Sequence, residues 1–303
     1  MHHENYVLTL IASPDSLLEP EALVSTAVVG TISRTTWLDE GIACDLFLHA
    51  PLEYATRAML QQRCDEARVD YVLQPTTTRE KKLLISDMDS TMIQQECIDE
   101  MARIVGKYDA VKTITASTMG TLGSDFTASL RTRLSMIAGV TVQQMQHIFD
   151  AVIQPMPGAK TLIATMKARG ASTHLVSGGF TFFSEKVAAM LGFDTHDSNL
   201  LDVNDGAITG NVIGEIVDKD KKKALLQHYA AQHNIPLSAT LAVGDGSNDV
   251  PMMQAAGLGV AYHASDSVRA KTAASIRFND LTALLYAQGI AKRDWVFLDA
   301  SSM

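Results

Sequence analysis

The sequence predicts an α/β protein of two parts: a small α+β domain, then a larger domain with a parallel sheet and a helical insertion. Its 303 residues have the length of about two ordinary domains. After residue 82, short apolar strands alternate with helical stretches, which is typical of βαβ units. A polar stretch, residues 73–82, lies between the two patterns and contains the helix breaker Pro75.

The first part, residues 1–80, is expected to form the α+β domain. We expect three strands, over residues 6–11, 42–48 and 69–73, and two helices, over residues 19–29 and 54–67. This order of strands and helices is that of a small α+β sandwich.

The second part, residues 81–303, is expected to contain strands over residues 83–85, 172–176, 240–243 and 258–261. Each of them ends at a polar cluster or turn. In open α/β sheets ligands bind beyond the carboxyl ends of the strands, so these clusters are candidate sites. The segment of about residues 92–153 has no strand signal and is too long for a simple crossover. We expect it to form a helical cap over the strand ends.

Composition excludes several classes of protein. A hydrophobic content of 47% with 19% charged residues predicts a folded core. No apolar run reaches the roughly 18 residues of a membrane span. The net charge of −9 disfavours nucleic acid as a partner. The three cysteines lack disulfide or zinc spacing and the N-terminus lacks an apolar signal segment, so we expect a cytoplasmic protein.

Two acidic clusters follow predicted strands. Asp87 and Asp89 follow the first strand of the second part, and Asp245 and Asp249 follow a later one, among glycines that allow a tight turn. One such cluster alone could simply cap the next helix. Two clusters at the ends of strands of one sheet can share a divalent cation, and carboxylate ligands suit Mg²⁺ rather than zinc.

Two further clusters favour a phosphate site over a purely structural metal site. Residues 177–179 (Ser-Gly-Gly) offer a hydroxyl and unhindered N–H groups before a helix expected over residues 180–191, whose N-terminus attracts anions. The lysines at 221–223 add positive charge, although at least two of the three are expected on a solvated face. A cation and a lysine would offset the repulsion between phosphate and carboxylate, about 4 kcal/mol for unit charges about 4 Å apart.

The two aspartates of the first cluster suggest a reaction. An ordinary aspartate titrates near about pH 3.9, so we expect Asp87 to be ionised and able to attack phosphorus. Asp89 has a like-charged neighbour, which favours its protonated form and a role as general acid and base. Together they predict two-step phosphoryl transfer through an aspartyl-phosphate.

In chain order, the four polar clusters described above resemble the four motifs of the haloacid-dehalogenase-like phosphatases. More narrowly, four segments are similar to the phosphoserine phosphatases: residues 87–100 (DMDSTMIQQECIDE), 129–134 (SLRTRL), 176–180 (VSGGF) and 243–249 (VGDGSND). The similarity extends over about residues 82–285. It implies a Rossmann-like core with a helical cap, Mg²⁺ as cofactor, and hydrolysis of O-phosphoserine to serine and phosphate, the last step of serine biosynthesis.

The resemblance implies a role for each matching position in the reaction. Asp87 matches the nucleophile and Asp89 the general acid and base. The Mg²⁺ ligands would be the side chain of Asp87, the backbone carbonyl of Asp89 and the side chain of Asp245. Asp249 would lie next to these ligands without binding the metal itself.

Other matching positions would bind the substrate. The phosphate binders would be Ser177, Gly178 and Lys222, and Asn248 would contact the substrate. Lys222 is chosen from the three lysines by its spacing from Glu215.

The cap would recognise the amino acid. Glu96 matches the residue that receives the substrate ammonium, and Arg133 matches the one that pairs with its carboxylate, which suits the guanidinium fork. Both could instead be ordinary helix-surface charges, and Glu100 or Arg131 could be mistaken for them.

The first 80 residues resemble, in pattern, the ACT-like regulatory domains, which implies serine or another amino acid as a ligand there. A homodimer is left open. Two other functions also stay open: transfer of the phosphoryl group to another alcohol such as homoserine, and an amino-acid-sensing phospho-acceptor switch. Asp89, two residues after Asp87, favours turnover over the switch.

Overall fold

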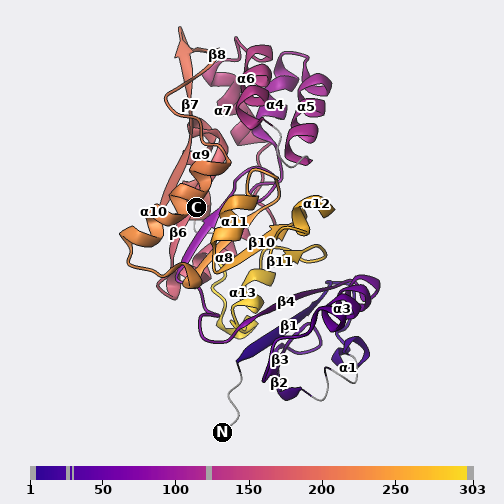
Figure 1. Cartoon of the computed structure of the whole chain (residues 1–303). Helices are drawn as coiled ribbons and strands as arrows, with labels where there is room; N and C mark the ends of the chain where they lie inside the picture. The colour runs from indigo at the N-terminus through magenta and orange to yellow at the C-terminus, as the bar shows by residue number, and fades with distance from the viewer. Residues whose placement is uncertain (1–4, 25–27, 29–30, 121–124, 299–303) are drawn as a thin grey trace.

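The computed structural model describes residues 5–24, 28, 31–120 and 125–298. Figure 1 shows a front module (residues 5–75) at one end of the molecule, a helical cap (α4–α7) at the other, and the core between them. Among the residues described, no helix is both long and apolar enough to cross a membrane.

The front module is a βαββαβ unit. Its elements are β1 (Tyr6–Ala12), α1 (Pro20–Leu23), β2 (Ile32–Asp39), β3 (Ala43–Leu48), α3 (Tyr54–Ala67) and β4 (Val69–Pro75). The strands are antiparallel in the order β2-β3-β1-β4. Leu23 of α1 and Leu60 of α3 belong to the same buried cluster as Leu8 and Leu46 of the sheet, so both helices cover one face.

The expected strands and the longer helix of this module are confirmed, with small shifts at their ends. The helix expected over residues 19–29 is interrupted at Val24, which has an extended backbone. Residues 25–27 and 29 of this expected range lie outside the described part of the chain. Strand β2 was not expected, because its largely polar sequence at the sheet edge lacks a clear apolar alternation.

The core is a parallel sheet with helices on both faces. Its elements are β5 (Leu83–Ser86), α8 (Ala159–Ala168), β6 (Ser172–Phe180), α9 (Thr181–Leu191), β7 (Thr195–Asn204), α10 (Lys219–Gln232), η1 (Leu237–Ala239), β9 (Thr240–Gly244), α11 (Val250–Ala255), β10 (Leu258–Tyr262), α12 (Asp266–Arg269), β11 (Ala274–Ile276), α13 (Ala283–Ala287) and η2 (Lys292–Asp294). The strand order is β11-β10-β9-β5-β6-β7. This confirms the predicted α/β class and the four expected strands.

All four residues of β5 are buried, and successive side chains point to opposite faces of the sheet, as expected for a strand covered on both faces. Leu83 and Ile85 belong to the apolar cluster that includes α10 and α11. Leu84 belongs to the cluster that includes α8 and α9. The polar groups that follow β5 are thereby fixed at the edge where β6 and β9 also end.

The cap comes between β5 and β6, in the segment where the sequence predicts it. It consists of α4 (Cys97–Ile104), α5 (Tyr108–Gly120), α6 (Phe126–Met136) and α7 (Val142–Ala151). Strand β8 (Ala207–Ile213) was not expected; it forms a hairpin with β7 that reaches the cap. The N–H of Ile208 donates to the carbonyl of Val140 at 2.9 Å, so the hairpin ties the cap to the core.

The front module and the core share one continuous sheet. Strand β4 pairs with β11 through Tyr71 and Ser275. Strand β4 extends to Pro75, so the polar connection is shorter than predicted and begins after this residue. Asp70 accepts hydrogen bonds from the backbone N–H groups of residues 277–279, at 2.8 to 3.1 Å. The division of the chain into two domains at residue 80 stays a prediction.

Candidate active site

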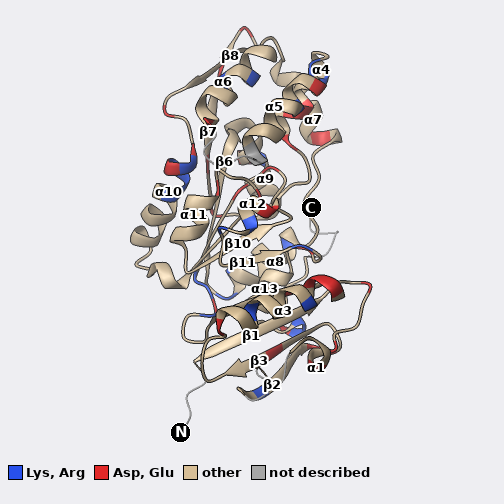
Figure 2. Cartoon of the chain, turned by 45° about the vertical axis from the view of Figure 1, so that its right-hand side comes forward, with Lys and Arg blue, Asp and Glu red and all other residues tan. Residues whose placement is uncertain are grey.

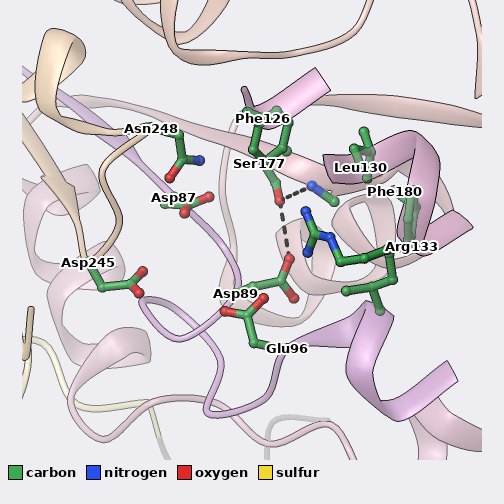
Figure 3. A pocket seen from close by; sticks show the side chains of 13 residues that line it. Asp87, Asp89, Glu96, Phe126, Leu130, Arg133, Ser177, Phe180, Asp245 and Asn248 are labelled. Atoms are coloured by element: carbon green, nitrogen blue, oxygen red, sulfur yellow. Dashed lines mark hydrogen bonds between the residues drawn. The ribbon is translucent and has the colours of Figure 1, made fainter. Parts of the chain in front are cut away.

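A small cavity lies where the carboxyl ends of β5, β6 and β9 meet the cap (Figure 3). It is lined by Asp87, Asp89, Glu96, Arg133, Ser177, Gly178, Asp245 and Asn248, among others. The candidate residues from all four motifs and from the cap thus come together, with Lys222 and Asp249 directly behind them. The cavity volume is about 20 Å³. One buried water needs roughly 10–15 Å³, so the cavity has room for little more than one water molecule.

Three carboxylates form a cluster at this edge of the sheet. Asp87, Asp245 and Asp249 each offer an oxygen, and these oxygens lie within 4.8 Å of one another. Burial and the charge of Asp249 raise the pKa of Asp87 well above its ordinary value, and they raise the pKa of Asp245 to about 7. The expectation that Asp87 is ionised assumed an ordinary aspartate. Burial raises the pKa of Asp87, whereas the buried ammonium of Lys222 beside it lowers that pKa, and a bound cation would favour the ionised form further. Oxygen donors are the ligands Mg²⁺ prefers, so this donor set fits the expected ion.

Lys222, in the first turn of α10, is fully buried against this cluster. Its Nζ lies 2.7 Å from Oδ1 of Asp87 and 2.7 Å from Oδ1 of Asp249. Of its neighbours, Lys221 pairs with Glu215 near the surface and Lys223 is exposed. Of the three adjacent lysines, the structure brings Lys222 to the carboxylates.

Asp89 is in a different environment from the cluster. Its Oδ1 accepts a hydrogen bond from the N–H of Cys97 at 3.0 Å, and its Oδ2 lies 3.4 Å from Oγ of Ser177 (Figure 3). Burial raises the pKa of Asp89 above its ordinary value. The sequence pattern predicts a raised pKa for Asp89 because of a neighbouring negative charge. In the structure the main cause of the raised pKa is desolvation by burial. A protonated Asp89 can donate a proton to a leaving oxygen.

Two glycines shape the irregular C-terminal end of β6, residues 177–179, which we call the β6 loop. Oγ of Ser177 accepts a hydrogen bond from the N–H of Gly179 at 2.8 Å. A Cβ atom on Gly178 would lie 2.5 Å from Cζ of Phe126 in the cap, and one on Gly179 would lie 2.7 Å from Oδ2 of Asp89. Glycine is therefore required for the cap and Asp89 to approach the loop this closely.

Asn199 on β7 holds this loop in place, and sequence reasoning missed it. Its Nδ2 donates to the carbonyl of Gly178 at 2.8 Å, and its Oδ1 accepts from the N–H of Val217 at 2.8 Å. It therefore links the β6 loop to the segment that leads into α10 and Lys222. Its strand has no recognisable motif, so the one available signal was a polar residue within a sheet strand.

Glu96 and Arg133 extend from the cap to the cavity (Figure 3). Oε1 of Glu96 accepts a hydrogen bond from Oγ of Ser90 at 2.8 Å. Nη1 of Arg133 donates to Oγ1 of Thr115 at 3.1 Å, and Thr115 in turn donates to Asp99 at 2.8 Å. The two residues that could have been mistaken for them are elsewhere: Glu100 pairs with Arg103, and Arg131 is exposed.

Two polar atoms at the cavity are buried without a hydrogen-bond partner among the described residues. They are Nη2 of Arg133 and Oδ1 of Asn248. A buried polar group left unpaired costs about 1–3 kcal/mol. The site is therefore suited to a ligand that carries an anionic acceptor for Arg133 and a donor for Asn248.

Known proteins are similar to this chain in both sequence and fold. Residues 84–254 match the haloacid dehalogenase-like hydrolase family. A phosphoserine phosphatase from Albidiferax ferrireducens is 42% identical over 215 residues, which cover 70% of this chain and 91% of that protein.

Two solved structures are similar as well. A HAD family hydrolase from Salmonella enterica subsp. enterica serovar Typhi superposes with a TM-score of 0.82 at 27% identity, covering 94% of this chain and 98% of that one. A substrate-bound phosphoserine phosphatase superposes with a TM-score of 0.65 at 36% identity, covering 68% of this chain and 98% of that one. The chain therefore belongs to the haloacid dehalogenase-like hydrolase family.

Proposed function

We propose that this chain is a phosphoserine phosphatase, which hydrolyses O-phosphoserine to serine and phosphate. The observation that carries the proposal is the pairing of a phosphate-type site with Glu96 and Arg133 around one cavity. A zwitterionic phosphoamino acid needs all three: an anion site, a carboxylate for its ammonium and a guanidinium for its carboxylate. The relatives named phosphoserine phosphatase support the same activity.

Asp87, Asp245 and the backbone carbonyl of Asp89 would hold Mg²⁺. When bound, the ion would neutralise the carboxylates and the phosphate so that the two can approach each other. Lys222, fully buried beside Asp87, would add a fixed positive charge. Ser177 and the N–H group of Gly178 would bind the phosphate oxygens together with Lys222.

The reaction would take place in two steps. In the first, a carboxylate oxygen of Asp87 bonds to phosphorus while the bond from phosphorus to the serine oxygen breaks, and Asp89 gives its proton to that oxygen. In the second, water attacks phosphorus, Asp89 takes a proton from it, and the bond to Asp87 breaks. The desolvated environment of Asp89, which favours its protonated form, supports its role in the first step.

Steady-state release of phosphate tests this proposal and its alternatives. We expect release from O-phosphoserine to exceed release from O-phosphothreonine and sugar phosphates, and to require Mg²⁺. Transfer to an added alcohol such as homoserine, at the expense of free phosphate, would favour the phosphotransferase. A phosphoenzyme that persists for minutes would favour the phospho-acceptor switch. Equal rates on all substrates would remove the proposed role of the cap.

For the front module we propose an ACT-like regulatory role with an amino acid such as serine as ligand. Its βαββαβ order supports this. Activity measured with added serine, compared with alanine at the same concentration, tests it. Inhibition by serine that persists when substrate is saturating is the expected result, because a separate site is not displaced by substrate. Purely competitive inhibition would place serine in the active site and contradict the proposal.

A further inference from the structure

A second polar cavity lies between the front module and the core, on the far side of the core from the cap. It has a volume of about 150 Å³. One wall comes from α3 and β4, and the other from α12, β11 and the segment that joins them. Figure 1 shows α12 and β11 next to the part of the front module that contains α3 and β4. We call this cavity the interdomain crevice.

Three guanidinium groups line the crevice. Arg57 comes from α3 in the front module, and Arg269 and Arg277 come from the core. Figure 2 shows basic residues on both α3 and α12. Nη2 of Arg57 already reaches across the crevice and donates to the carbonyl of Ala273 at 3.1 Å. The crevice thus has positive charge on both of its walls.

The two carboxylates that line the crevice neutralise only part of the positive charge of its arginines. Asp70 accepts hydrogen bonds from the backbone N–H groups of residues 277–279 and from the side chain of Asn279 at 2.9 Å. Asp65 pairs with Arg277 and accepts a further hydrogen bond from Gln61 at 2.7 Å. Three arginines against two aspartates leave one net positive charge on the lining itself, and the carboxylate that pairs with Arg269 from outside the lining, Asp266, is exposed to solvent.

One donor atom of Arg269 lacks a hydrogen-bond partner among the described residues, and this atom indicates where a ligand would bind. Arg269 pairs through Nη2 with the exposed Asp266, but its Nε is buried and has no hydrogen-bond partner in the described part of the chain. A guanidinium stays protonated at every physiological pH, so this donor cannot be removed by titration. An unpaired buried donor is unfavourable, and an oxyanion is the acceptor that suits a guanidinium best.

We propose that the interdomain crevice binds a small oxyanion of the size and charge of inorganic phosphate. The ion would accept hydrogen bonds from Nε of Arg269 in the core and from Arg57 in the front module. It would therefore bridge the two modules across the β4–β11 junction. The proposal concerns a site separate from the cavity under the cap and does not depend on the reaction there.

Equilibrium dialysis of the full chain against radiolabelled inorganic phosphate tests the proposal. The buffer contains a chelator, which weakens phosphate binding at the acidic cluster, and its ionic strength is held constant with chloride. We expect one equivalent of phosphate to bind in the crevice of the parent. In Arg269→Gln the affinity for this equivalent should be at least about tenfold weaker. Arg57→Gln, on the exposed helix of the other wall, should weaken the same equivalent.

Arg293→Gln is the matched control, because Arg293 is exposed in η2 and does not line the crevice. It should bind as many equivalents as the parent. Circular dichroism confirms that each variant is folded, and phosphate release from O-phosphoserine reports separately on the active site. The proposal is overturned if the parent binds no phosphate, or if Arg269→Gln and Arg57→Gln bind phosphate as tightly as the parent does. It is overturned equally if Arg293→Gln weakens binding as much as they do.

Discussion

Nζ of Lys222 lies 2.7 Å from Oδ1 of Asp87, and neither side chain is accessible enough for water to compensate its charge. Breaking a buried ion pair by removing one partner typically costs about 3–5 kcal/mol, because the other charge is left uncompensated. We therefore expect Lys222→Ala to lower the free energy of unfolding by an amount in this range. Urea denaturation measures it.

Lys223→Ala is the control for this prediction, since Lys223 is exposed on the same helix. Surface substitutions usually change stability by no more than about 0.5 kcal/mol. Equal stabilities of the two variants would mean that Lys222 does not compensate the acidic cluster.

Asn199→Asp should weaken phosphate binding at the active site without unfolding the sheet. The substitution keeps the shape of the side chain but replaces the donor to the carbonyl of Gly178 with a repelling oxygen. We expect the inhibition constant of phosphate and the KM for O-phosphoserine to rise about tenfold. Asn204→Asp, on the same strand but exposed, should leave both constants unchanged. An unchanged KM in Asn199→Asp would show that the loop does not need this support.

Arg133→Met should affect substrates according to whether they carry a carboxylate. The loss of a charge-assisted hydrogen bond costs about 1.5–3 kcal/mol, so kcat/KM for O-phosphoserine should fall roughly tenfold to a hundredfold. For phosphoethanolamine, which has the ammonium but no carboxylate, the change should be much smaller. Arg131→Met, exposed two residues away, serves as the control. Equal losses on both substrates would place Arg133 outside substrate recognition.

His174, which does not line the active-site cavity, should make the stability of the protein depend on pH. It is fully buried, stacks on Tyr229 with ring centroids 3.7 Å apart, and shares hydrogen bonds with Ser172 and Thr195. Burial, with a smaller effect of His233, lowers the pKa of His174 from 6.5 to about 4. The unfolded chain therefore binds this proton more tightly than the folded chain. The stabilisation is present above pH 6.5 and is lost as pH falls towards 4.

Urea denaturation from pH 7 to pH 4 checks this. The full contribution of His174 is roughly 3 kcal/mol. The stability of His174→Gln should fall less steeply over this window than that of the parent. His147→Gln, exposed on the cap, should keep the parent slope. Parallel curves for the parent and His174→Gln would contradict the prediction.

Much of the fold could be predicted from the sequence because it is encoded locally. The strands of the core are short apolar runs that end at polar clusters, and the cap is a long helical segment between two of them. Strands β2, β7, β8 and β11 were not predicted. Strands β2 and β8 lie at the two edges of the sheet, where pairing with a neighbouring strand stabilises them, and β2 is also largely polar in sequence.

The candidate site was predicted better than its electrostatics. The positions of the motifs after predicted strands indicate that Asp87, Asp89 and Asp245 lie close together, and the structure places all three around one cavity. The pKa shifts could not be predicted, because they depend on burial, which the spacing of residues along the chain does not contain. Asn199 was missed for a related reason, since its role arises from contacts between two loops that are distant in sequence.

The most direct test of the account is the rate of phosphate release from O-phosphoserine in the parent and in Asp87→Asn, with Mg²⁺ present and after chelation. Asp205→Asn, in the exposed hairpin turn, is the matched control. The account predicts release by the parent and by Asp205→Asn with Mg²⁺, little release after chelation, and none above background from folded Asp87→Asn. Turnover by Asp87→Asn at the parent rate would contradict the assignment of Asp87 as the nucleophile, and with it the mechanism.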